Sequence, residues 1–172
     1  GFITEGAALS YTSAIKRFGR DAARAIWQVT CDNRTLARQY IGEERIDCWY
    51  REAGNLKFSL SEAELAEDAA NVAAMEADGF GAELLTRGQT QALVGTELGP
   101  MIRGARYASY AGLVHSTRFV GGLAAAAQAR GATLVEATVT GIEHGKVTTS
   151  AGTLKAKAVV IAANAWISQL VP

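Results

Sequence analysis

The sequence predicts an α+β fold, in which an antiparallel sheet packs against helices and a shorter α/β segment forms the last third. Three observations lead to this prediction. Apolar residues recur at helical spacing in several segments, alternating runs with aromatic residues lie between turn residues, and the last third runs in the order helix, strand, meander, strand. The 172 residues, 49% of them hydrophobic, suffice for one domain with a core or for two small domains.

The first long element is predicted to be a helix over residues 21–40. Ile26, Val29, Leu36 and Tyr40 recur on one stripe, and a glycine two residues later supplies a stop. The segment "CWYREAGNLKFSL" follows it, with aromatic residues and alternating apolar positions on both sides of a glycine. This pattern predicts two strands joined by a turn.

A second helix is predicted to begin after Ser61 and to end near Asp78. Ser61 and Glu64 have the spacing of a capping box, in which each side chain accepts a hydrogen bond from a backbone amide of the first turn that has no partner within the helix. The buried face of this helix is expected to consist of Leu65, Ala69, Val72 and Met75.

Thr86 and Gln89 repeat the capping pattern and predict a shorter helix. The segment "ARYASYAGLVHS" then predicts a strand, because its aromatic residues favour extended structure. The main antiparallel sheet is therefore expected to form around residues 48–60 and 105–114.

The last third is predicted to contain one helix and a smaller sheet. Ser116 or Thr117 is expected to cap the helix and Gly131 to end it. "ATLVEATVTGIE" is expected to be extended, "HGK" to form a turn, and "KVTTS" and "TLKA" to form short strands. "AVVIAA" has the composition of a strand buried on both faces, although the strands that should flank it are not encoded in the chain. The inward face of the helix is expected to consist of Phe119, Leu123 and Ala127.

Composition excludes several classes of partner. Seventeen basic residues balance seventeen acidic residues, so no positive field favours nucleic acid or an anionic membrane surface. The longest apolar stretch, 158–167, is about half of the ~20 residues that a membrane span needs. Cys31 and Cys48 lack further ligands at metal-binding spacing, so we expect no metal site, no disulfide framework and a cytoplasmic protein. The opening "GFITEG" has neither an initiator methionine nor a signal peptide, which indicates a trimmed chain.

The segment "GLVHSTRFVGGLAAAAQARGATLVEATVTGIEHGKVTTSAGTLKAKAVVIAANAW" resembles the middle of the flavin-dependent amine and amino-acid oxidases. This group contains glycine oxidase, sarcosine oxidase, D-amino-acid oxidase and gamma-glutamylputrescine oxidase. "GFITEGAALSY", "FGRDAARAIW" and "GARYASY" resemble the last of these most, so the likeness covers nearly the whole chain. It implies an FAD-dependent oxidoreductase that oxidises the C–N bond of a small amine or amino acid with oxygen as acceptor.

The resemblance also implies a division of the chain. Residues 1–43 would be a helical segment linking to the N-terminal part of the FAD-binding domain, 44–115 a portion of the substrate-binding domain, and 116–172 the middle of a Rossmann-like FAD-binding domain. No G-x-G-x-x-G occurs in the sequence, and the pair Gly121-Gly122 is expected to be a packing feature inside a helix. The chain is therefore interpreted as an internal fragment, inactive alone and unable to retain FAD.

Four residues are expected to contact FAD by resemblance. Val139 matches a valine whose backbone contacts the adenine end, although "ATVTGI" is one residue shorter than the usual form. Ala162 and Ala163 match positions where the chain passes close to the dinucleotide, and Trp166 matches an aromatic position after that strand. The alternative is that the first three are ordinary strand residues and that Trp166 covers the end of the sheet.

Three residues are candidates for catalysis or substrate binding. His115 in "GLVHS" occupies a place where family members often have histidine and proline near the flavin, but serine replaces the proline here. Because the flavin carries the chemistry in this family, no acid or base is obligatory. Tyr107 and Tyr110 are expected to line the substrate cavity. The alternatives are helix capping or surface exposure for His115 and sheet packing for both tyrosines.

Three functional classes remain open at the level of sequence. The first is a piece of an FAD-dependent amine oxidoreductase, the second a non-catalytic binding module derived from that fold, and the third a subunit completed by another chain. Exposed strand edges and apolar faces are expected to favour self-association.

Overall fold

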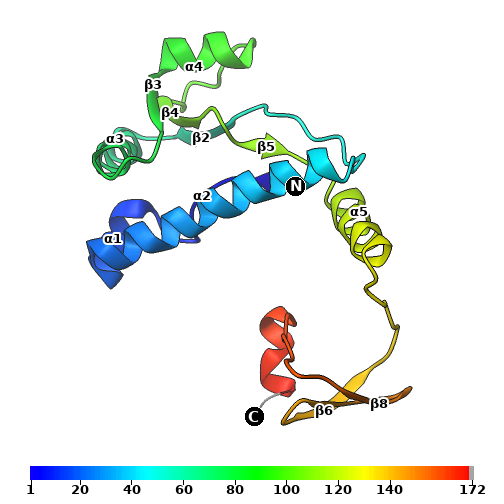
Figure 1. The fold of residues 1–172 in the computed structure, drawn as a ribbon. Coiled ribbons are helices and arrows are strands. Elements are labelled where there is room, and N and C mark those ends of the chain that lie inside the picture. Colours follow the sequence, from blue (N-terminus) through cyan, green and yellow to red (C-terminus); the bar gives the residue numbers. More distant parts are fainter. Residues whose placement is uncertain (171–172) are drawn as a thin grey trace. The chain divides into compact units, whose positions relative to one another are not determined.

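The computed structural model describes residues 1–170 and confirms the α+β class (Figure 1). Residues group into two compact units, Gly1–Ala127 and a second unit that begins at Gln128. The division falls inside the last long helix, α5 (Ser116–Ala129).

Two consecutive helices open the first unit. Helix α1 (Tyr11–Phe18) begins after Ser10, whose side chain accepts a hydrogen bond from the Ser13 amide. Gly19 separates it from α2 (Arg20–Glu43) and has a φ of 85°, which a residue with a side chain rarely adopts. The predicted helix over 21–40 is thus confirmed. Its predicted apolar stripe is only partly covered, since Val29 remains 67% exposed.

The main sheet of the first unit has three antiparallel strands in the order β2-β4-β3, with helices α3 and α4 beside it (Figure 1). Their bounds are β2 (Asn55–Ser59), α3 (Glu62–Ala77), β3 (Glu83–Thr86), α4 (Arg87–Val94) and β4 (Gly104–Ala108). Strand β3 was not predicted from the sequence. Its four residues are too few to show an alternating pattern, and pairing with β4 defines it.

Two predicted strands are wrong in extent. Of the pair expected in "CWYREAGNLKFSL", only β2 forms, and the first half makes a single bridge between Arg51 and Leu113. The strand expected over "ARYASYAGLVHS" is interrupted by a turn at 109–110 that separates β4 from β5 (Gly112–Leu113). Strand β5 pairs with β1 (Phe2–Ile3) in a separate two-stranded sheet. Both errors arise because pairing partners distant in sequence decide where these strands end.

The predicted caps at the starts of α3 and α4 are confirmed. Ser61 accepts from the Glu64 amide at the start of α3, and Glu64 accepts in turn from the Leu60 amide rather than from the amide of the cap residue. Thr86 and Gln89 form a complete capping box at the start of α4. Local side-chain chemistry therefore determines both starts.

The buried face of α3 differs from the prediction. Val72 and Met75 are buried as expected, whereas Leu65 and Ala69 are only partly covered. Two polar residues, Asp68 and Asn71, are buried beside them. Asp68 accepts hydrogen bonds from Lys57 and Ser59 of β2, and Asn71 accepts from the backbone and hydroxyl of Thr12. Burial of these groups is tolerated because each is paired.

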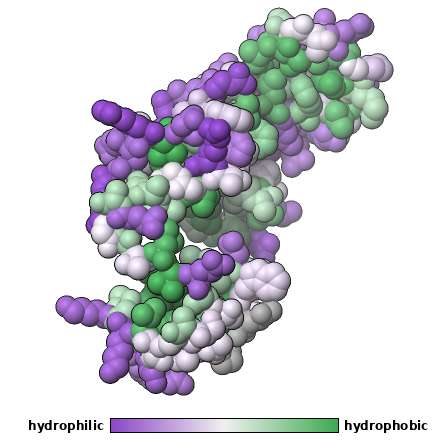
Figure 2. Space-filling view, turned by 90° about the vertical axis from the view of Figure 1, so that its right-hand side faces the viewer, coloured by the Kyte–Doolittle hydropathy of each residue, from purple (hydrophilic) through white to green (hydrophobic). Residues whose placement is uncertain are grey.

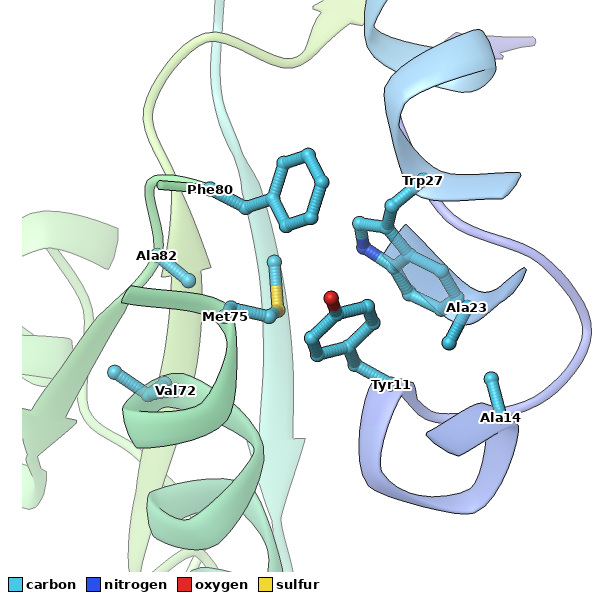
Figure 3. Packing of buried hydrophobic residues seen from close by; sticks show 8 residues of the cluster. All are labelled: Tyr11, Ala14, Ala23, Trp27, Val72, Met75, Phe80 and Ala82. Atoms are coloured by element: carbon cyan, nitrogen blue, oxygen red, sulfur yellow. The ribbon is translucent and has the colours of Figure 1, made fainter. Parts of the chain in front are cut away.

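The main hydrophobic core joins α1, α2 and α3 (Figure 3). The Tyr11 ring lies 4.8 Å from the Trp27 ring and 5.6 Å from the Phe80 ring, centroid to centroid. Such tilted and edge-on pairs add to the energy of area burial. Met75 of α3 completes the centre of the cluster and is fully buried. The other members are Ala14, Ala23, Val72 and Ala82.

The second unit contains the predicted meander. Strands β6 (Val139–Glu143), β7 (Lys146–Thr149) and β8 (Gly152–Lys155) pair antiparallel in chain order. His144 and Gly145 form the expected turn, and both have positive φ. A single 3₁₀ helix, η1 (Asn164–Gln169), follows the meander.

The buried strand predicted at "AVVIAA" is wrong for this structure. Residues 158–163 adopt no strand, and Val160 is 90% exposed. A strand needs a hydrogen-bonded neighbour, and within residues 1–170 no strand pairs with this segment. The apolar side chains of this segment are therefore not covered by the flanking strands that the prediction assumed.

Gly121 and Gly122 provide a matched test of helix packing in α5. A Cβ at Gly122 would overlap the buried side chain of Ile46, whereas a Cβ at Gly121 meets no atom within 4 Å. We expect Gly121→Ala to raise the free energy of unfolding by up to about 1 kcal/mol, since alanine favours helix. Gly122→Ala is expected to lower it, because overpacking costs about 1–3 kcal/mol. Urea unfolding of both variants measures the difference, and equal stabilisation by both would contradict the packing role.

Candidate functional site

An open cavity of about 690 Å³ lies in the first unit beside the start of α5. Three segments that are distant in sequence form its wall, namely the first residue, residues 49–51 and residues 113–117. Behind it lies a second hydrophobic cluster built on Ile46, Cys48 and Val114. The lining residues are Gly1, Trp49, Tyr50, Arg51, Leu113, Val114, His115, Ser116 and Thr117.

Backbone hydrogen bonds hold these segments together. The Arg51 and Leu113 backbones exchange two bonds of 3.0 and 2.8 Å, and the His115 amide donates to the Cys48 carbonyl at 2.8 Å. The amino group of Gly1 donates to the Val114 carbonyl at 2.7 Å. The wall is therefore fixed by main-chain geometry and does not depend on the identity of its side chains.

His115 is the N-cap residue of α5, in place of the predicted Ser116 or Thr117. Its carbonyl accepts from the Phe119 amide at 3.0 Å, and its Nδ1 accepts from the Arg118 amide at 3.4 Å. An imidazole nitrogen thus takes the part that a serine or threonine hydroxyl usually plays at a helix start. His115 combines the capping role considered from the sequence with a place on the cavity wall.

Four residues form a rim cluster at the cavity, and three of them were not singled out from the sequence. Asp47 and Arg118 form an ion pair of 2.6 Å. The Arg118 guanidinium carbon lies 4.4 Å from the centre of the Trp49 ring, and the Trp49 ring meets the His115 ring edge-on at 5.0 Å. No periodic pattern marks this cluster, because its members come from a loop and a helix start about 70 residues apart.

Tyr50 and Arg51 belong to the same wall. The Tyr50 hydroxyl is buried and has no hydrogen-bond partner among the described residues. Burial raises the pKa of this phenol, with Glu52 adding to the effect. Its ring lies against Gly112, where a Cβ would overlap it. An unpaired buried hydroxyl is costly and indicates a place where a ligand or water can bind.

The two candidate substrate tyrosines do not line this cavity. Tyr107 lies on β4 with its ring against Gly54, where a Cβ would overlap the ring. The Tyr110 hydroxyl donates to Glu5 Oε1 at 2.8 Å and also contacts the Gly81 carbonyl. Arg34 lies over the Tyr110 ring and pairs with Glu5. Burial, followed by the bond to Glu5, raises the pKa of Tyr110.

The four candidate FAD contacts all belong to the second unit. Val139 pairs with Thr149 at the start of β6, next to an irregularity in the register. Ala162 and Ala163 lie in the non-strand segment before η1, and Trp166 lies within η1 with 66% of its surface exposed. The three residues after the meander share one short stretch, and Val139 lies apart from them in the sequence.

Residues 1–170 contain neither a metal-binding cluster nor a membrane-spanning helix. No group of three or more histidine, cysteine, aspartate or glutamate residues lies close enough to hold a metal ion. No helix in this part of the chain combines the length and the apolar character needed to cross a membrane.

Comparison with protein-family models gives a match over residues 1–172 to the family DAO, described as FAD dependent oxidoreductase. Comparison with curated protein sequences gives no significant match. Among solved structures, glycine oxidase from Geobacillus kaustophilus is 27% identical with a TM-score of 0.72. The match covers 99% of this chain and 45% of the glycine oxidase, so the chain spans less than half of that protein.

Two other solved structures share the fold. Glycine oxidase from Bacillus cereus ATCC 14579 is 24% identical with a TM-score of 0.69, over 99% of this chain and 45% of that one. L-proline dehydrogenase from P. horikoshii is 22% identical with a TM-score of 0.71, over 79% of this chain and 37% of that one.

Proposed function

The chain belongs to the FAD-dependent oxidoreductase family, and from that premise we propose that it is part of an enzyme that oxidises the C–N bond of an amino acid or small amine. Oxygen is the proposed electron acceptor. The observation that carries the proposal is the cavity beside α5 in a chain that matches the family model throughout. Its volume of about 690 Å³ and its wall of aromatic residues with a few polar groups are typical of small-molecule sites.

The cavity residues fit one part of FAD better than another. The exposed Trp49 ring, beside the His115 imidazole, suits a planar ring with hydrogen-bonding edges, such as a flavin or a substrate bound against it. The pyrophosphate of a dinucleotide instead requires a glycine-rich turn at a helix start, and the sequence contains no G-x-G-x-x-G. The fit therefore supports a flavin-ring and substrate role for this wall.

When bound, FAD would supply the two-electron oxidation of the substrate C–N bond, with oxygen as the final acceptor. The protein supplies binding and orientation. His115 offers a hydrogen bond at the wall, while Trp49 and Leu113 supply its apolar surface. Arg51 lines the same wall, and its guanidinium makes no ion pair with other described residues, so it can receive an anionic group.

The remaining site assignments are part of the same proposal. Backbone atoms at Val139 and the small residues Ala162 and Ala163 would contact the dinucleotide, and Trp166 would cover that side of the site. Tyr107 and Tyr110 would contribute to the substrate side from β4 and the turn after it. Residues 44–115 would then serve the substrate-binding domain and 116–172 the FAD-binding domain, with 1–43 linking them to a further part of the latter.

Two alternatives are kept because the match covers 45% of the glycine oxidase. The chain could be a non-catalytic binding module that retains the substrate-domain sheet, or a subunit that another chain completes. An assay of hydrogen peroxide release, with FAD and with glycine, sarcosine, D-amino acids and gamma-glutamylputrescine as substrates, separates these cases. The assay requires an extended protein, in which this chain is fused to a segment that carries the G-x-G-x-x-G turn. Absence of turnover with every substrate would favour the non-catalytic module.

His115→Ala is expected to lower kcat/KM in that extended protein without abolishing turnover. Because the flavin performs the chemistry, the loss should stay below the roughly 10²–10⁴-fold that a positioned acid or base supplies. His144→Ala is the matched control, since His144 lies on the β6–β7 turn and should leave the rate unaltered. Unaltered kinetics for His115→Ala would mean that His115 only caps the helix. Complete loss of turnover would mean that the reaction requires His115, which would contradict an auxiliary role.

A further inference from the structure

We propose that Trp49, supported by Arg118, is a positioning residue that holds the His115 ring with Nδ1 toward α5 and leaves Nε2–H for the occupant of the cavity. The inference rests on the proposed function, because it concerns the same wall. It assigns a role to Trp49, which contacts the His115 ring, and to Arg118, which contacts Trp49. It also specifies which hydrogen-bonding group His115 presents to the cavity.

Two contacts define the position of the Trp49 ring, and an ion pair orients one of its two partners. Its flat face lies under the Arg118 guanidinium at 4.4 Å, and its ring plane is at 87° to that of His115. A cation over an aromatic face and an edge-on aromatic pair are both attractive arrangements. Arg118 is itself oriented by Asp47 at 2.6 Å. The four side chains therefore form a continuous series in which each member contacts the next.

The backbone of Trp49 provides independent support. Its φ of 54° lies in the left-handed region, which is uncommon for bulky side chains. Residues in such conformations persist where the surroundings over-determine them, and they gather at functional sites. At this position the neighbouring backbone is fixed by the bonds of Cys48 to His115 and of Arg51 to Leu113. The conformation turns an exposed tryptophan toward the ring of His115.

The hydrogen bond at Nδ1 determines which tautomer His115 adopts. A neutral imidazole has one protonated and one unprotonated nitrogen, and only the unprotonated one accepts. Since Nδ1 accepts from the Arg118 amide, the proton of the neutral ring lies on Nε2. His115 would therefore present a donor to the cavity and not a base. This agrees with a chemistry in which the flavin, and not the histidine, receives the hydrogen of the substrate.

The test is a measurement of the histidine tautomers by ¹⁵N nuclear magnetic resonance on the chain as it stands. The chain has two histidines, so His144 on the β6–β7 turn is an internal reference. The spectra are recorded at alkaline pH, about 8.5, where the signals of neutral imidazole report the tautomer. We expect widely separated ring-nitrogen signals for His115, with Nδ1 in the unprotonated range, and signals closer to the tautomer average for His144.

Variants then test the positioning role. Trp49→Ala and Arg118→Ala are expected to shift the His115 signals toward the tautomer average, while Trp49→Phe, which keeps an aromatic ring, should retain the wild-type separation. Gln128→Ala, an exposed change on the same helix, is the matched control. Unchanged circular dichroism and unchanged His144 signals would show that each variant is folded.

Two results would overturn the inference. One is that the ring-nitrogen signals of wild-type His115 lie as close to the tautomer average as those of His144. The other is that Trp49→Ala keeps the full separation of the His115 signals. Neither requires FAD or substrate, so this failure is distinguishable from failure of the proposed oxidoreductase activity. Peroxide release without a fixed tautomer would reject the positioning role alone, and a fixed tautomer without turnover would reject the activity alone.

Discussion

Tyr11→Ala is expected to lower the free energy of unfolding by about 3–5 kcal/mol, the usual range for removing a buried aromatic ring. Tyr11 is fully buried and contacts both Trp27 and Phe80, so the cavity left by alanine lies where α1, α2 and α3 meet. Domains of this size are stable by only about 5–15 kcal/mol. Urea unfolding, followed by tryptophan fluorescence and circular dichroism, measures the loss. A change below about 1 kcal/mol would contradict a central packing role.

Tyr11→Phe separates the hydroxyl from the ring. The hydroxyl donates to Asp78 at 2.7 Å, and Asp78 also accepts from Arg20. Removing the hydroxyl keeps the ring packing and leaves Asp78 with one partner, so we expect a smaller loss, of about 1–2 kcal/mol. A loss equal to that of Tyr11→Ala would mean that the hydrogen bond, and not the packing, stabilises this junction.

The same hydroxyl predicts how stability changes with pH. Burial and the hydrogen bond to Asp78 raise the pKa of Tyr11 to about 12. The folded chain therefore holds this proton more tightly than the unfolded chain, whose tyrosine pKa is about 10. Stability from this group is complete below pH 10 and is lost as the pH rises to 12. Tyr11→Phe should lack that alkaline loss, and unfolding curves measured across this range would show it.

The elements that could be predicted from the sequence are those determined by neighbouring residues. Ser61 with Glu64, and Thr86 with Gln89, determine helix starts through bonds spanning three or four residues. The meander around His144 and Gly145 depends on a two-residue turn. In each case the partners lie within a few positions, so the pattern and its energetic cause are visible together.

The elements that could not be predicted depend on distant partners. Strand β3 exists because β4 pairs with it, and residues 158–163 form no strand because none pairs with them. Within the candidate site, His115 was identified, but Trp49 and Arg118 were not, because the contacts that unite them cross about 70 residues. Side-chain type alone could not distinguish an exposed tryptophan on a loop from one that forms a cavity wall.

Self-association is the expected consequence of the uncovered apolar surface of the first unit. Besides the cavity beside α5, a groove of about 470 Å³ runs between β1, α2 and α5 and is lined largely by apolar residues. Exposed members include Phe2, Leu36 and Val120. Figure 2, a view from the right-hand side of Figure 1, shows hydrophobic residues exposed at the surface. Patches of this kind favour burial against a second surface, and light scattering over a range of concentrations would measure it.

The purified chain is expected to be colourless, with no flavin absorbance after dialysis. FAD carries two negative charges on its pyrophosphate, which Rossmann-type sites neutralise with helix-start amides reached through a glycine-rich turn. The sequence contains no such turn. The residues before α5 do not replace it, since His115 already accepts from the Arg118 amide there. Titration with FAD, monitored by calorimetry and by quenching of flavin fluorescence, should give no saturable binding at micromolar concentrations.

The contacts available elsewhere are too few to reverse this expectation. Val139, Ala162 and Ala163 would contribute only backbone and van der Waals contacts at one side of the dinucleotide. Immobilising a ligand costs at least several kcal/mol, and such contacts do not offset it. An extended protein that carries a G-x-G-x-x-G segment is the matched control and should turn yellow with FAD at one equivalent per chain. A yellow preparation of this chain alone, with one FAD retained through dialysis, would show that its own residues hold the cofactor without that turn.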